Sequence, residues 1–175
     1  MIKTIIFDMG MVVIKNNWEK ISKNVEKKYH ITTQISSSGN KKAIKEYEKT
    51  NTGKSSFKKV LELLGAEKKD IPKIIKAYKI EYKKHKVINK KLLELIKKLK
   101  GHYKIICLTD TNKLHHEANN EIGLFKDFDK IFASHIQKIR KENPRTFKKL
   151  LKQLKIEPQE TLFIDDNEKN IKNAK

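Results

Sequence analysis

The strongest constraint on the fold comes from an apolar run, Ile5 to Phe7, that ends on a single carboxylate, Asp8. Such a run is typical of a strand that is buried on both faces inside a parallel sheet. Because a charge is costly inside such a strand, Asp8 is expected where the strand ends. Ligands of open α/β sheets bind at that end, and Gly10 would let the backbone turn tightly beside whatever Asp8 holds. On this stretch alone, a structural aspartate in the turn after a strand is an equally good interpretation.

Strands and helices alternate along the rest of the chain. Further buried strands are predicted at 103–108, 130–133 and 161–164, with amphipathic helices between them. This alternation predicts an α/β fold, with a Rossmann-like, doubly wound parallel sheet and helices on both faces. We expect residues 1–14 and 87–175 to form this core domain.

The segment between the first two buried strands has a different pattern. Residues 15–86 show helical periodicity and no strand pattern, so we predict an inserted helical domain over this range. Trp18 is expected in the interior of this domain, with a position that faces the active site as the alternative. The predicted helices cover about 17–29, 41–49, 55–64 and 70–84.

The chain is strongly basic, with a formal net charge of +20, which raises nucleic acid as a partner. However, the lysines are spread over almost every predicted helix, and arginine occurs only at Arg140 and Arg145. Aromatic residues make up 7% of the chain, too few for a base-stacking surface. We therefore interpret the charge as a compositional bias and do not expect a nucleic-acid partner. A non-catalytic domain that binds a polyanion is kept as the alternative.

A single cysteine, Cys107, excludes an internal disulfide and suits a reducing compartment, so a cytoplasmic location is expected. Its apolar neighbours predict a buried structural thiol. No apolar run approaches the length needed to cross a bilayer, so no membrane association is expected. The six histidines lack metal-ligand spacing with a partner carboxylate, and most of them are expected to be solvated.

Polar side chains follow three of the predicted strands. Asp8 follows the first, Thr109 ends the second, and the Asp165–Asp166 pair follows the fourth. Carboxylates that meet without a counter-charge repel, and Mg²⁺ relieves this repulsion while it binds substrate phosphate and water. Lys141 and Thr109 can neutralise and bind a phosphoryl group, and a carboxylate in line with phosphorus can form an acyl-phosphate. Asp165–Asp166 alone would suit a helix N-cap, but three such clusters in this order are more specific.

These motifs resemble those of the haloacid dehalogenase-like (HAD) superfamily of hydrolases over nearly the whole chain, and in particular its capped sugar-phosphate phosphatase-like branch. The resemblance implies that the helical domain 15–86 is a cap over the core. The segments that carry it are Phe7–Val12, Leu108–Asn112, Ile139–Phe147, Phe163–Ala174 and, in the cap, Tyr47–Phe57.

The resemblance implies a Mg²⁺-dependent phosphatase that hydrolyses a small phosphate monoester, such as a sugar phosphate, through an aspartyl-phosphate intermediate. Asp8 would be the catalytic nucleophile. Mg²⁺ would be held by Asp8, the Gly10 carbonyl and Asp166. Asp165 would not contact the ion but would position the residues that do. The expected partner is therefore a small phosphorylated metabolite.

By the same resemblance, Thr109, Asp110 and Lys141 would bind the phosphoryl group, with Thr109 and Lys141 contributing to catalysis. The chain departs from the family pattern at two positions. Most phosphatases of the superfamily have a second aspartate, a general acid/base, where this chain has Gly10, and its loss typically costs about 10²–10⁴ in rate. Glu142 stands where proline usually follows the lysine, which would let that loop move.

The fifth strand of the family's sheet has no counterpart after residues 161–164. Leu162 and Ile164 would then lie in an open sheet edge, which favours association. We therefore expect either a truncated chain or a partner that covers this edge.

A metal-independent 2-haloacid dehalogenase is the other enzymatic alternative. In that reaction Asp8 would attack carbon instead of phosphorus. The Asp165–Asp166 pair argues against it, because dehalogenation does not need a pair of metal-holding carboxylates.

Overall fold

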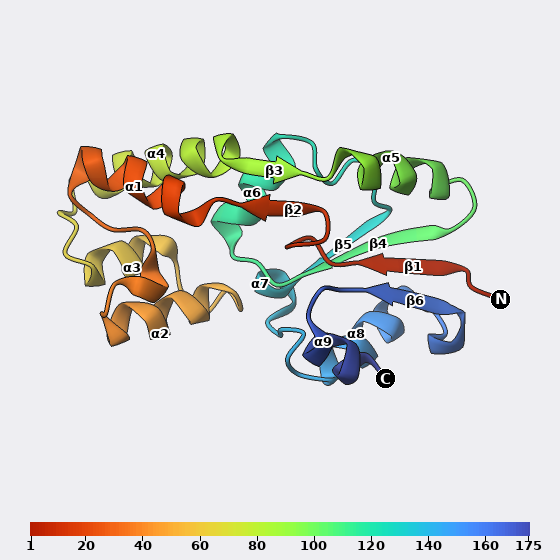
Figure 1. The fold of residues 1–175 in the computed structure, drawn as a ribbon. Helices are drawn as coiled ribbons and strands as arrows, with labels where there is room; N and C mark the ends of the chain where they lie inside the picture. The colour runs from red at the N-terminus through yellow and green to blue at the C-terminus, as the bar shows by residue number, and fades with distance from the viewer.

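A four-stranded parallel sheet lies at the centre of the core, in the strand order β5-β4-β1-β6 (Figure 1). The structure is a computed structural model that describes residues 1–175. Strand β1 lies between β4 and β6, in a register that places Phe7 beside Cys107 and Ile164. The carboxyl ends of the strands therefore meet at one edge of the sheet. The strands are β1 (Thr4–Phe7), β4 (Lys104–Thr109), β5 (Lys130–Ala133) and β6 (Thr161–Ile164).

Helices cover both faces of this sheet (Figure 1). Successive residues of β1 point to opposite faces, so Phe7 packs in one apolar cluster with Ile96 of α5, and Ile6 packs in another with Leu150 of α8. This arrangement confirms the predicted α/β fold class. Cys107 is fully buried, as predicted for a structural thiol. The core helices are α5 (Lys90–Leu99), α6 (Lys113–Glu121), α7 (Ser134–Gln137), α8 (Arg145–Leu154) and α9 (Glu168–Ala174).

The segment between the core strands folds into helices that lie to one side of the sheet (Figure 1). Their buried residues, among them Ile21, Val60 and Ile74, form a separate apolar cluster. Asn17 and Asn40 cap two of the helices by accepting hydrogen bonds from backbone N–H groups in the first turn. These helices are α1 (Trp18–Tyr29), α2 (Lys41–Thr50), α3 (Phe57–Leu63) and α4 (Ile71–Lys84), with a 3₁₀ turn η1 (Ile35–Ser37).

Two short strands join the helical segment to the core. Strands β2 (Ile14–Asn16) and β3 (Lys86–Ile88) pair antiparallel and form a separate two-stranded sheet. The prediction that residues 15–86 contain no strand is therefore wrong at both ends of that range. Three-residue strands are too short to show a two-residue periodicity, and their pairing partner lies some seventy residues away. The domain assignment to 1–14, 15–86 and 87–175 stays a prediction.

Helix α4 of the helical segment packs against α6 of the core. The Tyr78 hydroxyl lies 2.9 Å from Nε2 of His115, and Lys79 and Lys83 both pair with Glu121. Burial lowers the pKa of His115 to about 3, so its imidazole is neutral. Of the six histidines, His115 and His135 are buried, and the other four are partly or fully exposed.

The turn between α2 and α3 lies directly against α7. Gly53 has φ +63°, and a Cβ atom added there would lie 2.5 Å from the backbone oxygen of His135. We expect Gly53→Ala to lower the free energy of unfolding by at least about 1 kcal/mol more than Gly39→Ala does. Gly39 is the matched control, because it has φ +69° and open space around it. Urea unfolding of both variants measures the difference, and equal losses would show that the contact with α7 is unimportant.

Strand β6 lies at the edge of the sheet and pairs only with β1. Leu162 in this strand is 46% exposed. The prediction that a partner covers this edge stays a prediction. None of the helices combines the length and the apolar composition that crossing a bilayer requires.

Candidate active site

Three carboxylates meet at the carboxyl ends of β1 and β6. Asp8 follows β1, and Asp165 and Asp166 follow the adjacent β6, whose Ile164 carbonyl accepts a hydrogen bond of 2.9 Å from the Asp8 backbone N–H. One carboxylate oxygen from each aspartate lies within 4.8 Å of the others. Because β1 and β6 are parallel and adjacent, their ends bring together residues that are more than 150 positions apart in the sequence.

Lys141, from the loop before α8, bridges two of these carboxylates. Its Nζ lies 2.8 Å from Asp8 Oδ1 and 2.5 Å from Asp165 Oδ2, and the residue is only 2% exposed. Burial lowers the pKa of Lys141, but the charges of Asp8 and Asp165 outweigh burial and raise the pKa overall. The lysine is therefore a buried ammonium with two carboxylate partners.

Asp8 is a buried carboxylate, with 7% of the residue exposed. Burial raises its pKa to about 6, although the attraction of Lys141 acts in the opposite direction. At neutral pH its side chain is therefore an ionised carboxylate that is poorly solvated. A carboxylate in this state is suited to nucleophilic attack.

Asp165 is fixed in place by its neighbours. Its side chain is fully buried and accepts hydrogen bonds from the Asn167 backbone N–H at 2.8 Å and from the Asn170 side chain. Asp166, in contrast, is exposed. The two aspartates therefore lie in different environments. Neither of them is the N-cap of α9: this residue is Asn167, whose side chain accepts a hydrogen bond from the Lys169 backbone N–H.

The predicted phosphoryl-binding residues are not all directed at the cluster. Thr109 ends β4 and is buried. Both carboxylate oxygens of Asp110 accept the backbone N–H of Lys141 at 3.2 Å, so this side chain anchors the lysine loop. The Asp110 carboxylate therefore helps to position the loop that carries Lys141.

The residues present fit a magnesium ion. Oδ1 of Asp8 contacts Lys141. Its Oδ2 lies on the side of Gly10, 3.9 Å from the position that a Cβ atom of residue 10 would occupy. The exposed Asp166 supplies a second oxygen, and oxygen ligands are those that Mg²⁺ prefers. The backbone turns after Met9, whose carbonyl accepts the N–H groups of Val13 and Ile14, and the positive φ in this turn falls on Met11, at +57°, and not on Gly10.

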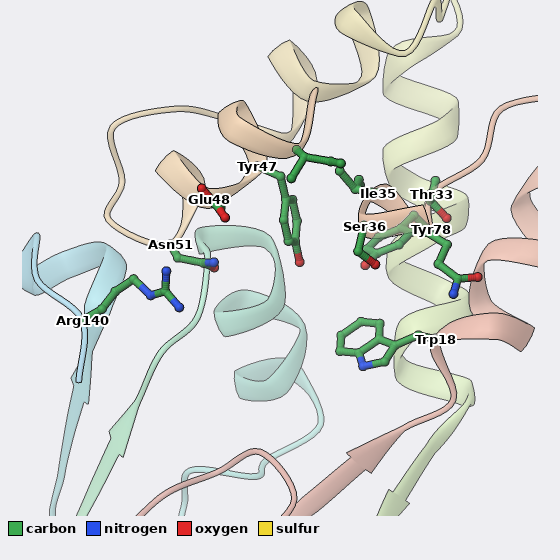
Figure 2. A pocket seen from close by; sticks show the side chains of 11 residues that line it. Trp18, Thr33, Ile35, Ser36, Tyr47, Glu48, Asn51, Tyr78 and Arg140 are labelled. Atoms are coloured by element: carbon green, nitrogen blue, oxygen red, sulfur yellow. The ribbon is translucent and has the colours of Figure 1, made fainter. Parts of the chain in front are cut away.

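A cavity of about 350 Å³ opens beside the lysine loop (Figure 2). Arg140, the residue before Lys141, points into it from the core, and Trp18 faces it from the start of α1. Asp8 does not line this cavity, but Arg140 directly precedes Lys141, whose Nζ contacts Asp8. The other lining residues are Thr33, Gln34, Ile35, Ser36, Ile44, Tyr47, Glu48, Asn51 and Tyr78.

Trp18 lies outside the helical interior, where it was first expected: it is 44% exposed and forms a wall of the cavity. Its ring is backed by Tyr82 and His115, with ring centroids 5.7 and 5.5 Å away. Sequence reasoning placed it inside because it continues the apolar periodicity of α1. Glu48 and Asn51 were also missed as cavity residues, since a polar position on α2 or at its C-terminal cap gives no sign of what it faces.

The fold and the site define an α/β protein with an acidic, lysine-bridged centre at the carboxyl ends of its parallel strands. The family model of haloacid dehalogenase-like hydrolases matches residues 2–175. The chain therefore belongs to the haloacid dehalogenase-like hydrolases, as its motifs predicted, and is an enzyme of that family.

Solved structures of this family share the fold. A HAD family enzyme from Bacteroides thetaiotaomicron is 26% identical, with a TM-score of 0.82, and the match covers 99% of this chain and 88% of that one. The same enzyme in complex with magnesium and inorganic phosphate matches with a TM-score of 0.79 at 26% identity, covering 99% and 89% of the two chains. An L-2-haloacid dehalogenase from Xanthobacter autotrophicus shares the fold at 17% identity and a TM-score of 0.64, over 99% of this chain and 74% of that one. No curated protein matches the chain.

Proposed function

We propose that the chain is a Mg²⁺-dependent phosphatase that hydrolyses a small phosphate monoester of the sugar-phosphate kind through an aspartyl-phosphate on Asp8. The observation that carries this proposal is the convergence of Asp8, Asp165 and Asp166 around Lys141 at the carboxyl ends of β1 and β6. The magnesium and phosphate complex of the Bacteroides enzyme supports it, because that relative binds both components. The substrate partner is then a small phosphorylated metabolite.

Each residue has a role that follows from its position. A carboxylate oxygen of Asp8 forms a bond to phosphorus as the ester P–O bond breaks and the alcohol leaves. Water then attacks phosphorus, which releases inorganic phosphate and restores the carboxylate. Lys141 and Thr109 stabilise the charge on the phosphoryl oxygens.

Magnesium would be held by Asp8, the Gly10 carbonyl and Asp166. When bound, it supplies positive charge that brings an anionic phosphate to an anionic nucleophile. Asp165 keeps Lys141 in place from the opposite side, at 2.5 Å.

The leaving alcohol receives no proton from position 10, where this chain has glycine. An added Cβ there meets only Asp8 Oδ2, at 3.9 Å, so a side chain fits. We expect Gly10→Asp to raise kcat/KM for alkyl phosphates by about 10- to 100-fold, since general acid catalysis typically contributes 10²–10⁴. For p-nitrophenyl phosphate, whose leaving group needs no proton, the change should stay within a few-fold. Gly10→Asn is the matched control, and an equal gain with asparagine would contradict the proton-donor explanation.

The direct test of the proposed function is phosphate release by the purified chain from p-nitrophenyl phosphate and a panel of sugar phosphates. Turnover with Mg²⁺ that stops when the metal is chelated supports the proposal. Halide release from a 2-haloacid in the presence of chelator would instead assign dehalogenation. Absence of both reactions, together with salt-sensitive binding of oligonucleotides, would favour the polyanion-binding alternative.

A further inference from the structure

Arg140 has a guanidinium group that the protein leaves largely without hydrogen-bond partners. Its Nε is buried and makes no hydrogen bond. The nearest carboxylates are Asp110, 3.7 Å from Nε, and Glu142, 3.5 Å from Nη1 and 58% exposed at its side chain. Both lie at ion-pair distance and neither gives the guanidinium a bidentate partner. The side chain as a whole is 31% exposed, so the outer nitrogens of the guanidinium are accessible to a ligand that offers the charge-assisted hydrogen bonds the protein does not.

The guanidinium faces the cavity and not the carboxylate cluster. Lys141 sends its Nζ to Asp8 and Asp165, whereas the preceding Arg140 lines the cavity together with residues of α1 and α2 (Figure 2). A phosphoryl group on Asp8 would therefore be neutralised by Lys141. The charge of Arg140 is therefore available to another part of the substrate.

The rest of the cavity suits an organic skeleton with hydroxyl groups. Trp18 offers an exposed aromatic wall, and Tyr47 points into the same space from α2 (Figure 2). Glu48 and Asn51 line it beside Arg140 and can accept hydrogen bonds from hydroxyl groups. The cavity thus combines an apolar wall, hydroxyl-binding groups and one cation.

We propose that the enzyme selects phosphate esters whose alcohol part carries a second acidic group, a carboxylate or a phosphate, and that Arg140 binds this group in the cavity. This inference rests on the proposed phosphatase function. It makes Arg140 a specificity-determining residue of the reaction. The preference would be a property of the cavity and independent of how Asp8 reacts.

Paired substrates test the preference and separate the two acidic groups. Glucose 1,6-bisphosphate against glucose 1-phosphate tests a second phosphate, and 3-phosphoglycerate against glycerol 3-phosphate tests a carboxylate. We expect kcat/KM to favour the doubly acidic member of at least one pair, and Arg140→Gln to lower that ratio about tenfold or more, as charge-assisted hydrogen bonds imply. The matched control is Arg145→Gln, because Arg145 is the other arginine of the chain and is exposed at the start of α8. It should leave the ratio unchanged.

The inference is overturned if neither pair shows a preference. It is also overturned if Arg140→Gln lowers kcat/KM equally for both members, because Arg140 would then bind the transferred phosphoryl group. Phosphate release from other esters in that case would still support the proposed function.

A second measurement does not depend on turnover. Trp18 is the one tryptophan of the chain, so its fluorescence reports ligands that enter the cavity. In an Asp8→Asn background, we expect the doubly acidic ligand to change the emission at concentrations about tenfold lower than its partner, and Arg140→Gln to remove this difference. Such a difference would support the inference even for a chain that hydrolyses nothing. If both ligands change the emission at the same concentration, the result would contradict the inference.

Discussion

Asp8→Asn is expected to lower the Mg²⁺-dependent hydrolysis of p-nitrophenyl phosphate by about 10⁴-fold or more, as removal of a catalytic nucleophile does in other hydrolases. The amide has nearly the same shape as the carboxylate but cannot form the acyl-phosphate. Lys141 keeps its 2.5 Å contact with Asp165, so the fold should be maintained. Initial rates with saturating Mg²⁺, together with a circular dichroism spectrum of the variant, provide the measurement.

Asp127→Asn is a suitable control for this change. Asp127 lies in the loop that leads into β5, at the opposite end of the sheet from Asp8. The Asp127→Asn variant should hydrolyse p-nitrophenyl phosphate at the rate of the unmodified chain. Turnover by Asp8→Asn close to that of the unmodified chain would rule out the aspartyl-phosphate mechanism.

Lys141→Met is expected to lower the free energy of unfolding by about 3–5 kcal/mol at neutral pH, the usual cost of removing one partner from a buried ion pair. Methionine fills similar space but leaves Asp8 and Asp165 facing each other without the ammonium that bridges them. Phosphatase activity should fall as well, because the phosphoryl group loses a positive charge. Urea unfolding and p-nitrophenyl phosphate turnover measure the two effects.

Magnesium distinguishes this explanation from a simple loss of packing. A cation bound to Asp8 and Asp166 relieves the repulsion, so Mg²⁺ should stabilise Lys141→Met more than it stabilises the unmodified chain. Adding Asp165→Asn to the Lys141→Met variant should recover part of the lost free energy of unfolding. Lys149→Met is the control, since Lys149 donates to the Gln137 carbonyl and has no carboxylate partner, and it should cost about 1 kcal/mol. A similar loss in both lysine variants, insensitive to Mg²⁺, would contradict the bridging role.

The core strands and their alternation with helices could be predicted from the sequence, because each strand is a short apolar run followed by polar residues. The Asp8 position after β1 and the Asp165–Asp166 pair after β6 were predicted on that basis, and they lie together in the structure. Parallel strands place their carboxyl ends at one edge, which is why a linear pattern was sufficient here. Membership of the haloacid dehalogenase-like hydrolases followed from the same motifs and is confirmed.

Other features had no local pattern to predict them. Strands β2 and β3 exist because residues far apart in the sequence pair with each other. The contact between the Asp110 carboxylate and the Lys141 backbone joins positions 31 residues apart, and no local pattern predicts it, whereas the phosphoryl-binding role of Asp110 stays a prediction. The same limit applies to Trp18, whose periodicity is that of a buried residue although its ring forms a cavity wall.

The sequence by itself determined the α/β fold, the family and the acidic residues that meet where the strands end. These properties depend on apolar periodicity and on where charges interrupt it, and both are properties of neighbouring residues. The tertiary structure alone decided that Lys141 bridges Asp8 and Asp165, and that Arg140 and Trp18 face one cavity. Such partnerships join side chains from separate elements, so they exist only after the helices and strands have packed together.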